Sequence, residues 1–301
     1  MSGMNLVERI KHFKNEKKAI LLVHNYQRPE IYDVADFIGD SLELSRRSVE
    51  TDAEMIVFCG VDFMAETAYI LNPQRTVLLP VLQARCPMAA MADAEGVRRM
   101  RRSHPDAAVV SYVNTSAEVK AESDICCTSA NAVEVVNSLD QDEVIFVPDE
   151  NLALYVQRYS KKRIIPWKGW CYVHTQFSAE ELKEMRRRHP DAEVIVHPEC
   201  KPEVIDLADY VCSTSQMVKR VAVSPKNEFI IGTEVGMIER LKMLYPDRRF
   251  YSAPPRSTCI QMKKITLRSI LKALEMERHK VQVPEEIRLR AKKALDRMLE
   301  L

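Results

Sequence analysis

Hydrophobic and polar residues follow one block pattern that recurs three times along the chain. Each block opens with a segment of helical periodicity, and these segments cover about residues 5–15, 93–103 and 178–188. Asp93 and Ser178 are residues of the type that caps helix amino termini. A short run rich in Val, Ile and Leu comes next, at Ala19 to Val23, Ala107 to Val110 and Glu193 to Val196. Continuous apolar runs of this length are typical of strands buried in a parallel sheet.

The rest of each block predicts two more strands, with a helix before each. The second helix begins near a hydroxyl residue, which is Ser41, Ser129 or Thr214. The second strand ends at Cys59, Val147 or Ile231. The third strand runs into a proline, which is Pro80, Pro166 or Pro254. Because strands that alternate with helices form parallel sheets, we expect an α/β protein of three repeated αβα sandwich domains around a pseudo-threefold axis, with the active site at the centre.

Alignment of the chain with itself supports the triplication. Residues 100–129 match residues 185–214 without a gap, and residues 17–41 match both more faintly. One equivalent position holds an aspartate in all three copies, at Asp36, Asp124 and Asp209. We predict three domains, at residues 1–86, 87–171 and 172–264. Residues 265–301 have helical periodicity without a fourth copy, and we expect them to pack on the first domain.

The charge balance and the short motifs of the chain exclude several classes of function. Among 301 residues, 44 Lys and Arg stand against 43 Asp and Glu, so nothing favours binding to nucleic acid or to an anionic membrane. No apolar stretch is long enough to span a bilayer and no secretory signal is visible, so we expect a cytoplasmic protein. The seven glycines form neither a dinucleotide fingerprint nor a phosphate loop, and the zinc-protease string H-E-x-x-H is absent.

Polar side chains follow the first strand of each block, where ligands bind in parallel α/β units. They are His24 and Tyr26, Tyr112 and Asn114, and His197 and Glu199. Members of a pair are two residues apart, so both side chains leave the strand on one side. A single such residue would be explained by a local hydrogen bond. The position is polar in all three blocks but chemically different in each, which suits an asymmetric substrate on a pseudosymmetric axis.

The hydroxyl residues Ser41, Ser129 and Thr214 mark the predicted starts of the second helices. Each alone is explained as an ordinary helix cap. Three helix amino termini aimed at one cavity, however, present free backbone N–H groups and positive dipole ends, which favour carboxylates or a phosphate. We therefore expect anionic substrates.

Three of the eight cysteines occupy an equivalent place in every block, after the third strand. They are Cys86, Cys171 and Cys259. Three thiolates that converge on one axis suit zinc or an iron–sulfur cluster. Structural zinc normally takes four ligands, whereas three cysteines suit a [4Fe–4S] cluster with one open iron, a Lewis acid that assists loss of water. Spacing alone does not distinguish the two. The other cysteines are interpreted as small core residues.

Short motifs over nearly the whole chain resemble those of the quinolinate synthase family, a bacterial and archaeal family of NAD biosynthesis. They are HNYQ from His24, GDS from Gly39, DFMAETA from Asp62, SYVN from Ser111, CTSAN from Cys127, GWCYVH from Gly169, HPEC from His197, STSQM from Ser213 and C-x-x-MK from Cys259. Some members carry a C-x-x-C redox pair near the carboxyl end. Met262 follows Cys259 here, which puts thiol–disulfide control in question.

The resemblance implies an activity and a set of site residues. The family condenses iminoaspartate with dihydroxyacetone phosphate to quinolinate, phosphate and water, and it holds a [4Fe–4S] cluster on three cysteines, which here are Cys86, Cys171 and Cys259. The implied substrate-binding residues are His24, Ser41, Tyr112, Val113, Asn114, Ser129, His197, Pro198, Glu199 and Thr214. The candidates for proton transfer are Tyr26, His174, His197 and Glu199. An enzyme that supplies iminoaspartate is an implied functional partner.

Two alternatives stay open at this point. The chain could be another [4Fe–4S] hydro-lyase that acts on a hydroxy acid, which would bind no phosphate. It could also be a non-catalytic binding module stabilised by zinc, which would be colourless because zinc is a d10 ion. Release of phosphate from dihydroxyacetone phosphate would exclude the first alternative. Brown colour after anaerobic purification would exclude the second.

Overall fold

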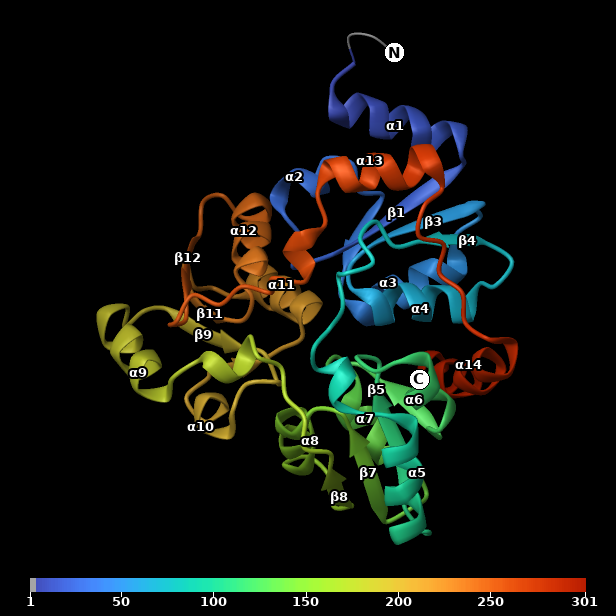
Figure 1. Ribbon diagram of the computed structural model, residues 1–301. Coiled ribbons are helices and arrows are strands. Elements are labelled where there is room, and N and C mark those ends of the chain that lie inside the picture. The colour runs from blue at the N-terminus through green and yellow to red at the C-terminus, as the bar shows by residue number, and fades with distance from the viewer. Residues whose placement is uncertain (1–3) are drawn as a thin grey trace.

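The computed structural model describes residues 4–301, which form three four-stranded sheets with parallel strands. The first sheet, in the order β2-β1-β3-β4, contains β1 (Ala19–His24), β2 (Phe37–Gly39), β3 (Met55–Cys59) and β4 (Thr76–Leu78). The second, in the order β6-β5-β7-β8, contains β5 (Ala108–Tyr112), β6 (Ile125–Cys127), β7 (Glu143–Val147) and β8 (Arg163–Pro166). The third, in the order β10-β9-β11-β12, contains β9 (Glu193–Val196), β10 (Tyr210–Val211), β11 (Glu228–Gly232) and β12 (Arg249–Ser252). The predicted fold class is confirmed, and Figure 1 shows the three sheets arranged around a common centre.

The helices recur in the same order around each sheet. The first helices are α1 (Leu6–Glu16), α5 (Ala94–Ser103) and α9 (Ala179–Arg188). Short helices follow the first strands: α2 (Pro29–Tyr32), α6 (Ala117–Ala121) and α10 (Pro202–Ile205). Before the next strands lie α3 (Ser41–Glu50), α7 (Ala132–Asn137) and α11 (Thr214–Val223), and then α4 (Asp62–Leu71), α8 (Glu150–Gln157) and α12 (Val235–Leu244). As predicted, Asp93 and Ser178 cap α5 and α9, accepting hydrogen bonds from Gly96 N at 2.7 Å and Glu181 N at 3.3 Å.

Each sheet contains one strand that the hydrophobic pattern did not predict. These strands, β2, β6 and β10, are two or three residues long and pair with the first strand of their sheet from its outer side. A segment this short has too few positions to show strand periodicity. An aspartate directly before each of these strands holds it against the first strand of its sheet. The side chains of Asp36, Asp124 and Asp209 accept hydrogen bonds at 2.7–2.8 Å from the backbone N–H groups of Leu21, Val109 and Val194, respectively.

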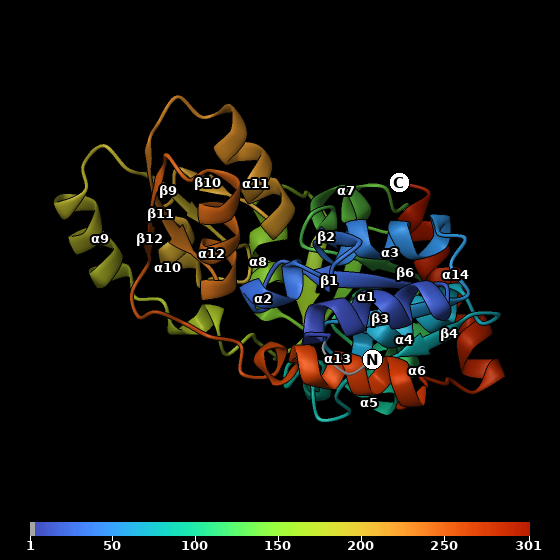
Figure 2. The same cartoon turned by 90° about the horizontal axis from the view of Figure 1, so that it is seen from above.

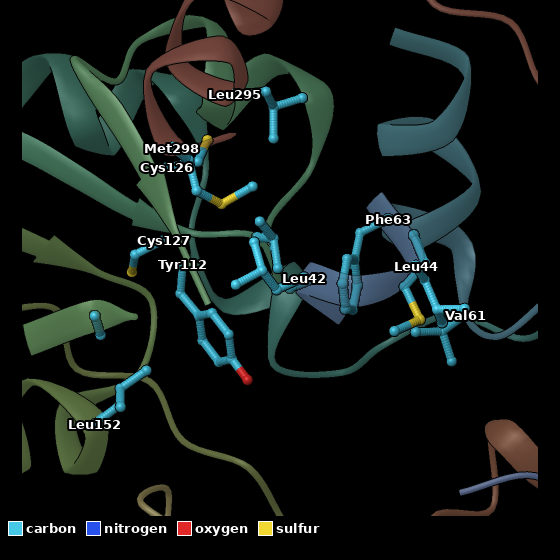
Figure 3. Close-up of a cluster of buried hydrophobic side chains, with 14 of the residues drawn as sticks. Leu42, Leu44, Val61, Phe63, Tyr112, Cys126, Cys127, Leu152, Leu295 and Met298 are labelled. Carbon is cyan, nitrogen blue, oxygen red and sulfur yellow. The ribbon is translucent and has the colours of Figure 1, made fainter. Parts of the chain in front are cut away.

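A large apolar core runs through all three units. Phe63 of the first unit, Phe146 of the second and Phe229 of the third belong to one cluster of buried side chains. Figure 3 shows the part of this cluster in which Tyr112 of β5 lies near the first unit and Met298 packs close to β6. Burial of this apolar surface fixes the three sheets against each other and thereby positions the strand ends. Among residues 4–301, no helix is both long and apolar enough to cross a bilayer.

The carboxyl-terminal helices differ from the prediction that both pack on the first unit. The helix α13 (Leu267–Met276) does lie on α1 and β3, side by side with α1 in Figures 1 and 2. The chain then follows the edge of β4, and α14 (Glu285–Leu299) packs mainly on α6 and β6 of the second unit, with α4 on its other side. Its buried stripe includes Ala291 and Leu295. Helical periodicity shows which face is apolar, but not which unit covers that face.

Candidate functional site

A cavity lies where the three units meet, and residues of all three line it. The predicted site residues that line the cavity are His24, Tyr26, Ser41, Tyr112, Asn114, Ser129, His174, His197, Glu199, Thr214, Cys86, Cys171 and Cys259. Val113 instead lies in the apolar core, and Pro198 lines a neighbouring pocket together with Ser129. The structure thus brings together groups that are up to 235 positions apart in sequence, because the carboxyl ends of parallel strands from each sheet point to the same centre.

Glu199 is the central carboxylate of the cavity. Its Oε1 accepts a hydrogen bond from Tyr112 OH at 2.5 Å, and its Oε2 lies 2.8 Å from Nδ1 of His174. Burial alone would raise the pKa of Glu199, but His174, His197 and the Tyr112 hydroxyl outweigh burial and hold this pKa well below its usual range. Glu199 is therefore an ionised carboxylate inside a site from which water is largely excluded.

Four other titratable side chains around Glu199 are neutral: His24, Tyr26, Tyr112 and His197. Burial lowers the pKa of both His24 and His197 to about 3, so both rings are uncharged near pH 7. Burial also raises the pKa of Tyr26 and Tyr112 well above the ordinary value for a phenol. His174 stacks on His197 with ring centroids 4.3 Å apart. A neutral imidazole can donate or accept a proton, and a neutral phenol can donate one. Such groups can therefore take part in proton transfer inside the cavity.

A buried hydroxyl that the sequence analysis missed connects two of these side chains. Thr233 Oγ1 lies 2.6 Å from Tyr26 OH and 2.8 Å from Nε2 of His174. Together with the His174–Glu199 contact, this gives a continuous hydrogen-bonded path from Tyr26 to Glu199. Thr233 directly follows β11, but Gly60 and Pro148 follow the equivalent strands β3 and β7, so comparison of the repeats gave no signal for a hydroxyl at this position.

The residues that cap the helices around the cavity are not the hydroxyl residues for which capping was the simple explanation. Ser41 and Thr214 are the first residues of α3 and α11, whereas Asp40 and Ser213 cap these helices. Asp40, which also lines the cavity and was missed, accepts from Leu42 N and Glu43 N at 3.0–3.1 Å and from Ser213 Oγ at 3.0 Å.

The hydroxyls of Ser41, Ser129 and Thr214 are therefore free of the capping role. In the second unit α7 begins only at Ala132, three residues after Ser129. The Thr214 hydroxyl accepts a hydrogen bond from Asn25 Nδ2 at 3.0 Å, which ties the first unit to the third. Within residues 4–301 the cavity lining contains no Lys or Arg, so helix starts, hydroxyls, imidazole N–H groups and the Asn114 amide are the donors available there for an anion.

The three predicted ligand cysteines lie on three equivalent loops. Each follows the last strand of its sheet and precedes a short 3-10 turn: Ala89–Met91, His174–Gln176 or Met262–Lys264. Burial raises the pKa of Cys86, Cys171 and Cys259, and backbone N–H groups of these turns partly counteract it. The thiols are neutral unless a metal stabilises the thiolate. The other cysteines, Cys59, Cys126, Cys127, Cys200 and Cys212, are buried in the cores, as interpreted.

The grouping of possible ligand atoms indicates where a metal ion could bind. Thiolates on one tetrahedral zinc ion lie about 4 Å apart, because each Zn–S bond measures about 2.3 Å. Among residues 4–301, the one group of three His, Cys, Asp or Glu whose ligand atoms all lie within 4.8 Å of one another is Cys171, His174 and Glu199. This group is compatible with a metal ion. Cys86, Cys171 and Cys259 share the cavity lining, but within the described residues they do not form such a close group.

Comparison with known proteins agrees with this site. A family model described as "Quinolinate synthetase A protein" matches residues 8–300. The chain is 54% identical over 299 residues to "Quinolinate synthase 1" of Methanosarcina acetivorans, which covers 99% of this chain and 98% of that protein. It is 51% identical over 300 residues to "Quinolinate synthase" of Pyrococcus horikoshii, covering 99% of each. The chain therefore belongs to the quinolinate synthetase A family of enzymes.

Proposed function

We propose that this enzyme condenses iminoaspartate with dihydroxyacetone phosphate to give quinolinate, one inorganic phosphate and two waters. The observation that carries the proposal is the arrangement of the central cavity, where the ionised Glu199 sits between Tyr112 and His174 and three cysteines lie in the same lining. Membership in a family of enzymes removes the support for a non-catalytic zinc module. A cytosolic location belongs to the proposal and is supported by eight cysteines that are all free thiols.

The cavity suits two anionic substrates of different shape. Iminoaspartate carries two carboxylates, and dihydroxyacetone phosphate carries a phosphate. The starts of α3 and α11 and the hydroxyls of Ser41, Ser129 and Thr214 offer uncharged donors and positive dipole ends to such anions. Because each unit contributes different polar side chains, the site is asymmetric, as binding of two unlike molecules requires.

The residues around Glu199 account for the proton transfers of the reaction. The sequence of carbon–carbon bond formation, phosphate loss, isomerisation, ring closure and dehydration involves no net redox change, so its demands are proton transfer and stabilisation of leaving groups. Glu199 is positioned as the general base because it is ionised and within 2.8 Å of His174. The path through Thr233 connects it to Tyr26, which can return a proton at a second point of the cavity.

The three cysteines would hold the cofactor beside this proton-transfer path. Cys86, Cys171 and Cys259 fit a [4Fe–4S] cluster, and such a cluster, with one iron free of protein ligands, supplies a Lewis acid that assists loss of water. Cys171 lies three residues before His174, so the turn that follows this cysteine also carries part of the proton-transfer path. The upstream partner must be an enzyme that forms iminoaspartate, since this imine hydrolyses in water.

The proposed reaction is tested by its stoichiometry. The protein, purified without oxygen and reconstituted with iron and sulfide, is mixed with dihydroxyacetone phosphate and freshly generated iminoaspartate. We expect quinolinate and phosphate to appear in a one-to-one ratio, measured by chromatography and by a phosphate assay. Formation of neither product by protein that holds a full cluster would contradict the proposal, and would favour a hydro-lyase that acts without phosphate release.

Removal of the Thr233 hydroxyl is expected to slow the reaction. Thr233→Val keeps the side-chain shape but removes both hydrogen bonds of the hydroxyl, to Tyr26 and to His174, which corresponds to roughly a tenfold to hundredfold loss in kcat. Thr233→Ser keeps the hydroxyl and serves as the matched control, with near wild-type kcat. Steady-state kinetics of both variants make the measurement, and an unchanged kcat in Thr233→Val would rule out the path through this residue.

A further inference from the structure

The backbone of each cysteine loop is hydrogen-bonded to the first residue of a nearby helix. This helix is α4, α8 or α12, which follows β3, β7 or β11. The first backbone N–H groups of α4, α8 and α12 donate to a carbonyl two residues before the cysteine. The three bonds are Asp62 N to Ala84 O at 2.9 Å, Glu150 N to Gly169 O at 2.8 Å and Val235 N to Ser257 O at 3.0 Å. The repeat thus preserves one docking geometry for all three loops, at the ends facing the cavity.

A carboxylate at each of these helix starts also faces the cysteine itself. The backbone N–H of Cys86 donates to Oδ1 of Asp62 at 3.0 Å, and that of Cys259 donates to Oε1 of Glu234 at 3.0 Å. These bonds fix the cysteine backbone and leave the thiol free to point into the cavity. Neither Asp62 nor Glu234 was identified by the sequence analysis as a site residue.

The second unit has the same arrangement in a looser form. Asp149 pairs with Gly169 in an isolated parallel bridge, and the neighbouring Glu150 N donates to Gly169 O at 2.8 Å, so Asp149 and the Cys171 loop lie side by side. No hydrogen bond of normal length joins the Asp149 side chain to the Cys171 backbone, and within the described residues Oδ2 of Asp149 is buried without a partner. The free oxygen is the acceptor that a small shift of the Cys171 loop would satisfy.

The carboxylates do not occupy strictly equivalent positions, which argues against a passive remnant of duplication. Asp149 and Glu234 are the capping residues of α8 and α12, whereas Asp62 is the first residue of α4, one position further on. A carboxyl group beside the cysteine loop is therefore preserved in every unit although the position that provides it has shifted. Capping alone is served equally well by Ser or Asn, so it does not explain a carboxyl group as deeply buried as that of Asp149, and the buried Glu234 is in addition paired with Lys263 at 3.1 Å.

We propose that Asp62 and Glu234 are positioning residues for the metal centre, each holding the backbone of one ligand cysteine, and that Asp149 is placed to do the same for the Cys171 loop, so that the three thiols face the cavity before iron binds. The inference rests on the proposed cluster. Three thiolates brought together without metal repel each other, and loops free to move would separate them. Hydrogen bonds from the cysteine backbone to these carboxyl oxygens keep the loops in place at no cost to the thiols, which remain available as ligands.

The test compares loop opening in the apoprotein and iron retention in the reconstituted full-length protein. In Asp62→Ala, we expect hydrogen–deuterium exchange of residues 79–88 to rise about ten- to a hundredfold, which is the value of one hydrogen bond to a charged group. We also expect faster release of iron to a chelator under anaerobic conditions. Asp62→Asn keeps an oxygen acceptor and should restore most of both properties. In Glu234→Ala, the faster exchange should be confined to residues 253–262.

The chain offers a matched control in Asp36. It makes the same kind of contact, from Oδ2 to the backbone N–H of Leu21 at 2.7 Å, in the same unit but away from the cysteine loop. Asp36→Ala should leave exchange of residues 79–88 and iron release unchanged.

Several results would overturn the inference. The inference would be contradicted by a wild-type exchange rate in Asp62→Ala or by an equal effect of Asp36→Ala. It would also be contradicted if a single variant loosened all three cysteine loops. Failure of Asp62→Asn to restore protection would refute the acceptor role. Failure of the wild-type protein to take up iron would instead refute the proposed cluster, while exchange in the apoprotein would still decide whether the carboxylates hold the loops.

Discussion

Glu199→Gln is expected to lower turnover by about a hundredfold to ten-thousandfold, the usual contribution of a positioned general base. Gln has nearly the same shape, and its amide oxygen can still accept the hydrogen bond from Tyr112. It cannot take a proton or hold a negative charge against His174. The measurement is the rate of quinolinate formation by reconstituted protein, together with the cluster absorbance, which should equal that of the wild type.

The control for this variant is Glu203→Gln, an exposed glutamate on α10 only four residues away. It changes the same charge close to the site without touching the cavity lining, so its turnover should be near wild type. Near-normal turnover in Glu199→Gln would remove the base from the mechanism. Loss of the cluster absorbance in that variant would show that Glu199 acts on the metal centre and not on protons alone.

Cys171→Ala is expected to abolish both the cluster and the activity. Without Cys171, a [4Fe–4S] cluster would keep only two protein ligands, Cys86 and Cys259. The described cavity lining contains no further cysteine that could replace Cys171. After reconstitution we expect iron and sulfide contents near background and no brown colour. Cys86→Ala and Cys259→Ala should behave in the same way, because the three loops are equivalent.

Cys212→Ala is the matched control for the cysteine variants. Cys212 is a free cysteine in the apolar core, outside the cavity lining, so its removal costs some packing but no ligand. This variant should keep wild-type iron content and turnover. A full cluster in Cys171→Ala, or equal iron loss in Cys212→Ala, would contradict the assignment of the three ligands.

The repeats explain why so much of the site was predictable. A duplicated α/β unit places equivalent residues at the same end of equivalent strands, so matched positions such as His24, Tyr112 and His197 had to converge once the units packed around one centre. The same comparison finds the three ligand cysteines. It fails for residues present in only one unit, which is why Thr233 was missed, and for carboxyl groups at shifted positions, as with Asp62, Asp149 and Glu234.

Local pattern and tertiary packing thus decided different things. Hydrophobic periodicity and capping residues determined the first helices, the long strands and the α/β class, because these depend on interactions between near neighbours. The edge strands β2, β6 and β10, the placement of α14 on the second unit, and the ionised state of Glu199 among neutral rings were decided only by the folded structure. Sheet pairing, helix docking and desolvation arise between segments far apart in the chain, and no local pattern encodes which of those segments meet.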